Sequence, residues 1–260
     1  MSTRRPTMTF GDDGTPACDV AWLWINNHTW LGWRLEVLTA HQPPVGQVLP
    51  HALTQPHAWQ PARPRVPFQT GRFDEVMQLT AEADPRLALS RKTDLLVIGP
   101  RGPGLLKSLH LGSTADWLLL HPPAPMVIVR HGQRVQSIVA CVDGSPHAAR
   151  AIEALCALPW VNQTTVTVLA VDDGVVNVDA AMAGATTALL AAGASVQSHI
   201  DSGNPLEGII SQLDQIAPDL VVLGTRGLTG IARLKLGSTA SAVTRIASCS
   251  VLVACADDSA

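Results

Sequence analysis

The sequence predicts an α/β fold in two tandem domains, each a five-stranded parallel sheet with helices on both faces, as in Rossmann-like nucleotide-binding folds. The first observation is a repeat, because residues 93–102 (TDLLVIGPRG) align without gaps with residues 218–227 (PDLVVLGTRG) at an offset of 125. The second is that β-branched apolar segments alternate with segments of helical periodicity. The third is that the apolar segments are continuous, which is typical of parallel strands covered on both faces.

The second copy shows the alternation more clearly. Gly193 ends one of its helices as a C-cap residue, and Pro205 opens the next helix. The expected elements, in chain order, are a strand at 135–142, a helix at 147–158, a strand at 166–171, a helix at 179–192, a strand at 196–200, a helix at 205–216, a strand at 220–223, a helix at 238–247 and a strand at 251–254.

The first copy follows the same course with one interruption. Residues 42–67 contain seven prolines where the second copy has its second helix, and proline at that density prevents a normal helix. We expect an extended or polyproline crossover there, with Trp59 as an anchor on the sheet. Six of the seven tryptophans lie in this copy, where we expect packing at a domain interface. The predicted domains are residues 1–132 and 133–260.

Composition excludes several classes of function. With 18 basic and 21 acidic residues the net charge is −3, which is unsuited to general nucleic-acid binding. We expect no membrane span, because no stretch reaches the roughly 20 strongly apolar residues needed, and no secretory signal. The five cysteines form no C-x-x-C pair, so neither a zinc site nor a disulfide framework is expected. These features predict a cytoplasmic protein.

A glycine pattern follows the fourth strand of each copy. It reads Gly-x2-Gly-x9-Gly-Ser, at Gly99, Gly102, Gly112 and Ser113 in the first copy and at Gly224, Gly227, Gly237 and Ser238 in the second. One interpretation is a duplicated structural turn. The other is an anion site, in which amides of the loop and of the first helical turn at Gly237, Ser238 and Thr239 face a phosphate chain. On that interpretation Ser238 acts as the N-cap or as a phosphate ligand.

A carboxylate stands at the end of the first strand of each copy. Asp13 and Asp143 both precede a glycine, and the alternatives are a simple helix-entry turn or an acceptor for a ribose hydroxyl or an adenine amino group. Arg101 and Arg226 lie inside the glycine loops, where each either reaches a phosphate or remains solvated. The pattern matches neither the dinucleotide fingerprint nor the Walker P-loop, and no nucleophile–base pair indicates a hydrolase.

These motifs resemble the universal stress protein family in its tandem form, and the resemblance covers essentially the whole chain. It implies ATP binding by matched positions, with Asp13 and Asp143 at the ribose or adenine and the glycines and serines named above at the phosphates. It further implies that Ala40 or Val171, and Ile98 or Leu223, line the adenine pocket. The proline-rich crossover is a departure from the family pattern in the first copy.

The resulting prediction is an ATP-binding regulatory protein of the stress response, without dedicated catalysis or with slow ATP hydrolysis at most. Mg²⁺ is expected through the phosphates rather than in a protein cage. The alternatives are an adenylating or flavin-dependent enzyme of related architecture, or a protein-interaction scaffold. We expect regulatory protein partners, no nucleic acid and no membrane as partners, a homodimer on resemblance, and pairing of the two domains through residues 126–129 and 251–254.

The second copy is predicted to bind ATP more tightly than the first. Pro100 and Pro103 stand in the first loop where the second has Thr225 and Leu228, so two backbone N–H donors are missing.

Overall fold

The computed structural model describes residues 4–41, 53–54, 71–100, 111–174, 178–227 and 236–256. The chain divides into two compact units, Met1–Gly132 and Gln133–Ala260. The proline-rich stretch, except for residues 53–54, and Trp59 lie outside the described residues, so the polyproline prediction stays a prediction.

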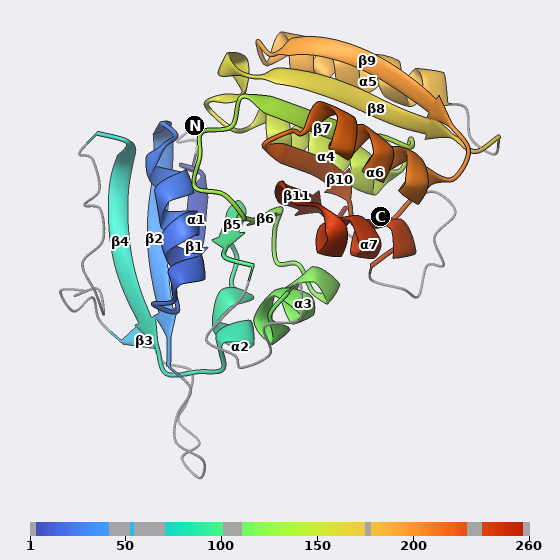
Figure 1. Cartoon of the computed structure of the whole chain (residues 1–260). Helices are drawn as coiled ribbons and strands as arrows, with labels where there is room; N and C mark the ends of the chain where they lie inside the picture. Colours follow the sequence, from blue (N-terminus) through green and yellow to red (C-terminus); the bar gives the residue numbers. More distant parts are fainter. Residues whose placement is uncertain are drawn as a thin grey trace. The chain divides into compact units, whose positions relative to one another are not determined.

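The first unit is built on a mostly parallel sheet (Figure 1). Its strands lie in the order β3-β4-β2-β1-β5-β6, and the two-residue β3 pairs antiparallel with β4. The sheet therefore has one short strand more than the five predicted. The elements are β1 (Thr7–Gly11), α1 (Pro16–Asn26), β2 (Trp30–Ala40), β3 (Leu53–Thr54), β4 (Phe73–Ala81), α2 (Pro85–Leu89), β5 (Leu95–Ile98), α3 (Ser113–Leu120) and β6 (Met126–Ile128).

The second unit has five parallel strands in the order β9-β8-β7-β10-β11. The chain order places β7 at the centre, as in a doubly wound fold. The elements are β7 (Ser137–Cys141), α4 (Pro146–Cys156), the 3₁₀ turn η1 (Val161–Gln163), β8 (Thr165–Asp172), α5 (Val178–Ala191), β9 (Ser195–Ser202), α6 (Pro205–Ile216), β10 (Leu220–Gly224), α7 (Ser238–Ile246) and β11 (Ser250–Ala254).

Helices cover both faces of the second sheet, as the sequence predicts. Helix α4 packs against α5 and against β10, while α6 packs against α7 and β8 (Figure 1). Helix α4 begins where Ser145 accepts a hydrogen bond from the amide of Ala148, with Pro146 at its first position. Helix α6 begins in the same way at Asn204, whose side chain accepts from the amides of Leu206 and Glu207.

The tryptophans of the first unit belong to its core. Trp22, Trp24, Trp30 and Trp33 are each at most 6% exposed, and the ring of Trp30 stacks on Phe73 with 5.8 Å between centroids. The Trp30 indole also donates to the backbone oxygen of Ile25. The interface packing expected for these four residues is therefore wrong: they fill the interior of their own unit, where large aromatic rings bury the most apolar area.

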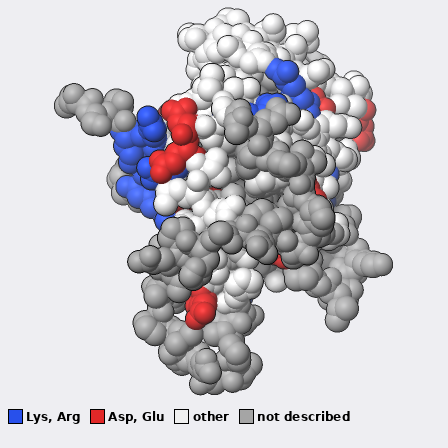
Figure 2. Space-filling model, turned by 90° about the vertical axis from the view of Figure 1, so that its left-hand side faces the viewer, with Lys and Arg blue, Asp and Glu red and all other residues white. Residues whose placement is uncertain are grey.

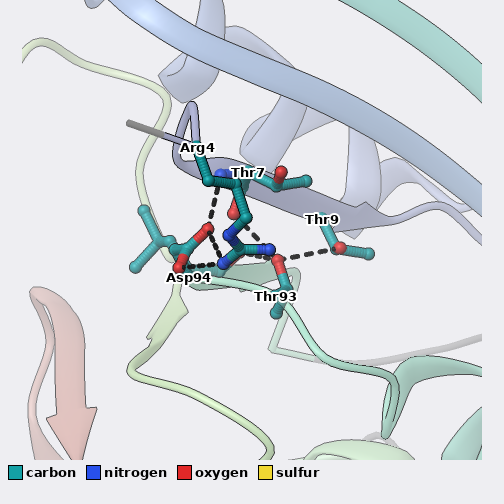
Figure 3. A network of polar contacts seen from close by, with 6 residues as sticks. Arg4, Thr7, Thr9, Thr93 and Asp94 are labelled. Carbon is teal, nitrogen blue, oxygen red and sulfur yellow. Dashed lines mark hydrogen bonds and ion pairs between the residues drawn. The ribbon is translucent and has the colours of Figure 1, made fainter. Parts of the chain in front are cut away.

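Both copies have an Asp-Leu pair at the start of a strand, β5 in the first unit and β10 in the second. Asp94 accepts from the amide of Thr7 and from Arg4, and Thr93 joins the network by its contact with Thr9 (Figure 3). In the second unit Asp219 accepts from the amides of residues 136 and 137 at distances of 2.8 and 3.0 Å. In each copy this carboxylate satisfies the amides at the start of the central strand, which fixes that strand beside its neighbour.

Several charged side chains of the first unit form ion pairs. Ion pairs join Arg4 to Asp94, Arg34 to Glu75 and Arg91 to Glu36. Figure 2 shows basic and acidic side chains next to one another on the face it presents. On that face the described residues therefore form no broad patch of positive charge such as a nucleic-acid backbone requires.

Candidate functional site

The candidate site of the second unit lies at the carboxyl ends of its strands. Asp143 follows β7, and its Oδ1 accepts from the amide of Ser145 at 2.9 Å. Between them Gly144 has a φ of 78°, and in the first unit Gly14 has a φ of 74°. That left-handed conformation requires glycine, so the Asp-Gly pair forms the same tight turn in both copies.

Gly227 brings the glycine loop against this carboxylate. A Cβ added at Gly227 would lie 2.7 Å from Oδ2 of Asp143. The backbone of the loop therefore approaches the strand-end carboxylate as closely as a glycine allows. Asp143 and Gly227 are 84 positions apart in the sequence, and the fold brings their two motifs together in one candidate site.

Ser145 joins the same two segments. Its hydroxyl accepts from the amide of Ala148 as the N-cap of α4 and donates to the backbone oxygen of Arg226 at 3.1 Å. Ser145 is 2% exposed, so this bond is shielded from water. Sequence reasoning missed this residue, although its place two positions after Asp143 marks it as an N-cap.

Gly224 is in close contact with the backbone of α4. A Cβ there would lie 2.5 Å from the backbone nitrogen of Ala148 and 2.6 Å from the carbonyl carbon of His147. Gly224 thus allows the first turn of α4 to pack directly on the end of β10. This packing is sufficient to explain why position 224 is a glycine, and the predicted contact of Gly224 with a phosphate stays a prediction.

Gly237 is the N-cap of α7, and no side chain caps this helix. Its own amide donates to the backbone oxygen of Thr225 at 2.7 Å. The prediction that this amide faces a phosphate is therefore wrong. Ser238 is the first helical residue and not the N-cap. The amides of Ser238 and Thr239 belong to the first turn, where an α-helix provides no backbone acceptor. These amides remain the candidate phosphate donors.

The two residues of the second unit proposed for an adenine pocket lie on strands that flank β7 on opposite sides. Leu223, in β10, is 4% exposed and belongs to the core. Val171, near the end of β8, is half-buried, and its methyl groups lie 3.0 and 3.3 Å from a Cβ added at Gly208 of α6. Val171 therefore forms part of the packing between β8 and α6, at the same sheet end as Asp143.

The first unit repeats the loop closure. Gly112 is the N-cap of α3, again without a side-chain cap, and its amide donates to the backbone oxygen of Pro100 at 2.9 Å. Ser113 is therefore the first helical residue, not the N-cap. Asp13 is exposed and accepts from the amide of Thr15, which matches the bond between Asp143 and Ser145.

The other predicted residues of the first unit that the structure describes lie at the carboxyl ends of β5 and β2. Ile98 and Gly99 are buried at the end of β5, and Ala40 is half-buried at the end of β2. Gly102 and Arg101 lie outside the described residues. One difference between the copies is a second acidic residue, since Asp12 is 4% exposed where the second copy has Val142.

The argument from missing amides in the first loop is partly wrong. Thr225, the counterpart of Pro100, donates its amide to the backbone oxygen of Ala254 in β11 at 2.8 Å. That amide serves the sheet, so proline at position 100 removes no phosphate donor. Pro103 and Leu228 lie outside the described residues.

The part of the chain that the structure describes holds no cluster of three His, Cys, Asp or Glu side chains able to bind a metal ion. All five cysteines are free thiols. Among the described residues, no helix is both long enough and apolar enough to cross a membrane.

Comparison with known proteins identifies the family. The profile of the universal stress protein family matches residues 46–130 and 134–254. The chain belongs to this family and carries two copies of its domain. A Thermus aquaticus protein named "Universal stress protein in QAH/OAS sulfhydrylase 3'region" is 31% identical over 113 residues, which are 38% of this chain and 79% of that protein.

A solved structure shows the same tandem fold. A universal stress protein from Archaeoglobus fulgidus matches with a TM-score of 0.62 and 18% sequence identity, and the match covers 97% of this chain and 99% of that one. The predicted α/β architecture in two tandem copies is confirmed.

Proposed function

We propose that this protein is a nucleotide-binding universal stress protein with a regulatory role, and that ATP is its ligand. The observation that supports this most strongly is the meeting of Asp143, the Gly227 backbone and the first turn of α7 at one end of the second sheet. A carboxylate beside a glycine loop is suited to a nucleoside, with the carboxylate accepting from a ribose hydroxyl. The positive end of a helix is suited to phosphates.

Each residue has a specific role in this proposal. Oδ1 of Asp143 is used in the turn to Ser145, so Oδ2, which faces the loop, accepts from the ribose. The first-turn amides of Ser238 and Thr239 donate to phosphate oxygens. Arg226 adds positive charge within the loop. Mg²⁺ is held by phosphate oxygens and water, because the described residues form no acidic cluster.

The proposal includes a cytoplasmic location, consistent with free thiols, and a homodimer. Nucleotide binding changes the surface or the assembly of the protein, and ATP is hydrolysed slowly at most. An adenylating enzyme would release pyrophosphate with a second substrate, a flavoprotein would purify with a yellow cofactor, and a scaffold would retain no nucleotide. Mass spectrometry of small molecules released from the purified protein separates these alternatives.

Replacing Asp143 tests the site directly. We expect Asp143→Asn to keep the turn, because the amide oxygen can still accept from Ser145, and to lose the ribose acceptor. ATP affinity measured by calorimetry should fall about tenfold, the effect of one hydrogen bond to a charged group. Asp214→Asn, at an exposed position of α6, is the control and should bind like the wild type. Equal affinity of Asp143→Asn and wild type would remove Asp143 from the site.

The two copies should differ in affinity. We expect the second copy to bind ATP more tightly than the first, because Thr225 and His147 brace its loop while Pro100 and Ala17 stand at the matched positions. Val at an N-cap position obstructs the loop and caps poorly. Titration with ATP should therefore show that Gly237→Val removes the tighter binding phase and Gly112→Val the weaker one. Loss of the tighter phase in Gly112→Val would reverse the ranking.

A further inference from the structure

His147 lies in the first turn of α4, next to the glycine loop. Its ring Nδ1 is 2.9 Å from the backbone nitrogen of Ala256 and 3.2 Å from Oγ1 of Thr225. A backbone N–H can only donate, so Nδ1 is an acceptor and carries no proton. The proton of the neutral ring is therefore on Nε2.

The ring connects three segments of the second unit. Thr225 is fully buried, its amide donates to Ala254, and its backbone oxygen accepts from Gly237. Its hydroxyl donates to Nδ1, because the N–H of Ala256 already fixes Nδ1 as an acceptor. Helix α4, the loop after β10 and the residues after β11 are thus held together at a single nitrogen atom.

This connection is specific to the second copy. The residues aligned with His147 and Thr225 in the first copy are Ala17 and Pro100, which have neither a ring nitrogen nor a hydroxyl. The first loop closes on Gly112 without it. Loop closure in the first copy therefore uses no histidine, and the bonds of His147 with Thr225 and Ala256 distinguish the second site.

We propose that His147 is a positioning residue that makes nucleotide binding by the second domain depend on pH. The inference rests on the proposed function, since it concerns regulation of that same site. When Nδ1 takes up a proton it becomes a donor, and it then opposes the N–H of Ala256 instead of accepting it. The residues after β11 separate from α4, Thr225 loses its acceptor, and the backbone of Thr225, which accepts from the amide of Gly237, is no longer held in place.

Each segment beside the ring carries a charged or titratable residue. The loop before α4 contributes Asp143, the loop after β10 contributes Arg226, and the segment after β11 contributes Cys255. Helix α4 itself carries Arg150 one turn further on. Helix α5 has Asp179 as its one charged residue, exposed in its first turn, and β10 and β11 have none. Among the residues named in this paragraph, His147 is the histidine, and histidine is the residue type that ordinarily titrates between pH 5 and 8.

Three variants of the full-length chain test the proposal. The amide oxygen of Asn can occupy the place of Nδ1, and it accepts at every pH of interest, so His147→Asn should bind ATP like the wild type at pH 7.5. His147→Ala should bind about tenfold more weakly at that pH. His199→Asn is the control, because His199 is an exposed histidine in β9 of the same unit.

The pH profile separates a positioning role from a merely structural one. Between pH 7.5 and 5.5 the wild type and His199→Asn should lose about tenfold more ATP affinity than His147→Asn, which is the loss expected when one ordinary imidazole must be neutral. Protonation of ATP affects all variants equally and cancels in this comparison. The phase to be followed is the one that Gly237→Val removes. Parallel profiles for wild type and His147→Asn would overturn the proposal.

Hydrogen exchange gives a readout that needs no nucleotide. After correction for the intrinsic pH dependence of exchange, protection of the Ala256 amide should fall on acidification in the wild type and stay constant in His147→Asn. If the wild type binds no nucleotide at any pH, the proposed function fails, and the exchange data still decide whether His147 is a pH-sensitive connection. Equal protection in both proteins across this range would exclude it.

Discussion

Gly224→Ala should unfold the second domain at a temperature roughly 10 °C below the wild type. The added Cβ would lie 2.5 and 2.6 Å from backbone atoms of Ala148 and His147, distances that real Cβ atoms do not show. Backbone cannot rotate away as a side chain can, so α4 must shift from β10. Overpacking of this kind costs about 3 kcal/mol, which corresponds to that change in unfolding temperature for a domain of this size.

Gly184→Ala is the matched control for this prediction. Gly184 lies within α5, and nothing is within 4 Å of a Cβ placed there. Alanine is favoured over glycine in a helix by about 1 kcal/mol, so this variant should be as stable as the wild type or more stable. Calorimetric scans of the three proteins provide the comparison. Coincident unfolding of Gly224→Ala and Gly184→Ala would show that the contact between β10 and α4 is not tight.

Alkaline pH should destabilise both domains through buried thiols. Burial, with the nearby charge of Asp13 adding to it, raises the pKa of Cys18 to about 12. Burial likewise raises the pKa of Cys141 to about 12, with smaller contributions from Cys249 and Asp143. An unfolded thiol has its ordinary pKa near 9, so above pH 9 the unfolded chain loses a proton that the folded protein retains.

The sign follows from this difference in bound protons. The contribution of each thiol to stability is constant below pH 9 and falls as pH rises from 9 towards 12. At pH 10.5 the loss is about 2 kcal/mol per thiol. The absence of tyrosine from the sequence removes phenol ionisation from this range.

Cysteine variants isolate the effect. Cys18→Ala introduces the residue that the second copy carries at the matched position, Ala148, and should make the first domain less sensitive to pH between 8 and 10.5. Cys141→Ala should do the same for the second domain. Denaturant unfolding followed by tryptophan fluorescence gives the stability at each pH. If Cys18→Ala and the wild type lose stability equally as pH rises, the Cys18 thiol of the wild type ionises in the folded protein.

The repeat, the α/β class and the residues that come together at the carboxyl ends of the strands could all be predicted from the sequence. Those features have local causes. Continuous β-branched segments form buried parallel strands, and Asp143 followed by Gly144 specifies a turn that needs a left-handed residue. Because parallel strands end at one edge of a sheet, the strand order alone brings Asp143 and Gly227 to the same edge.

The contacts that each motif residue makes there are visible only in the folded protein. Glycine at 224 permits helix packing, glycine at 227 admits a carboxylate, and the amides of Gly237 and Thr225 are used by the loop and the sheet. A sequence shows that a side chain is absent but not which atoms occupy the space, since those atoms come from segments about 80 residues away. For the same reason the contacts of His147 with Thr225 and Ala256 could not be predicted, because no local pattern marks a helix residue whose partners lie in the segments after two distant strands.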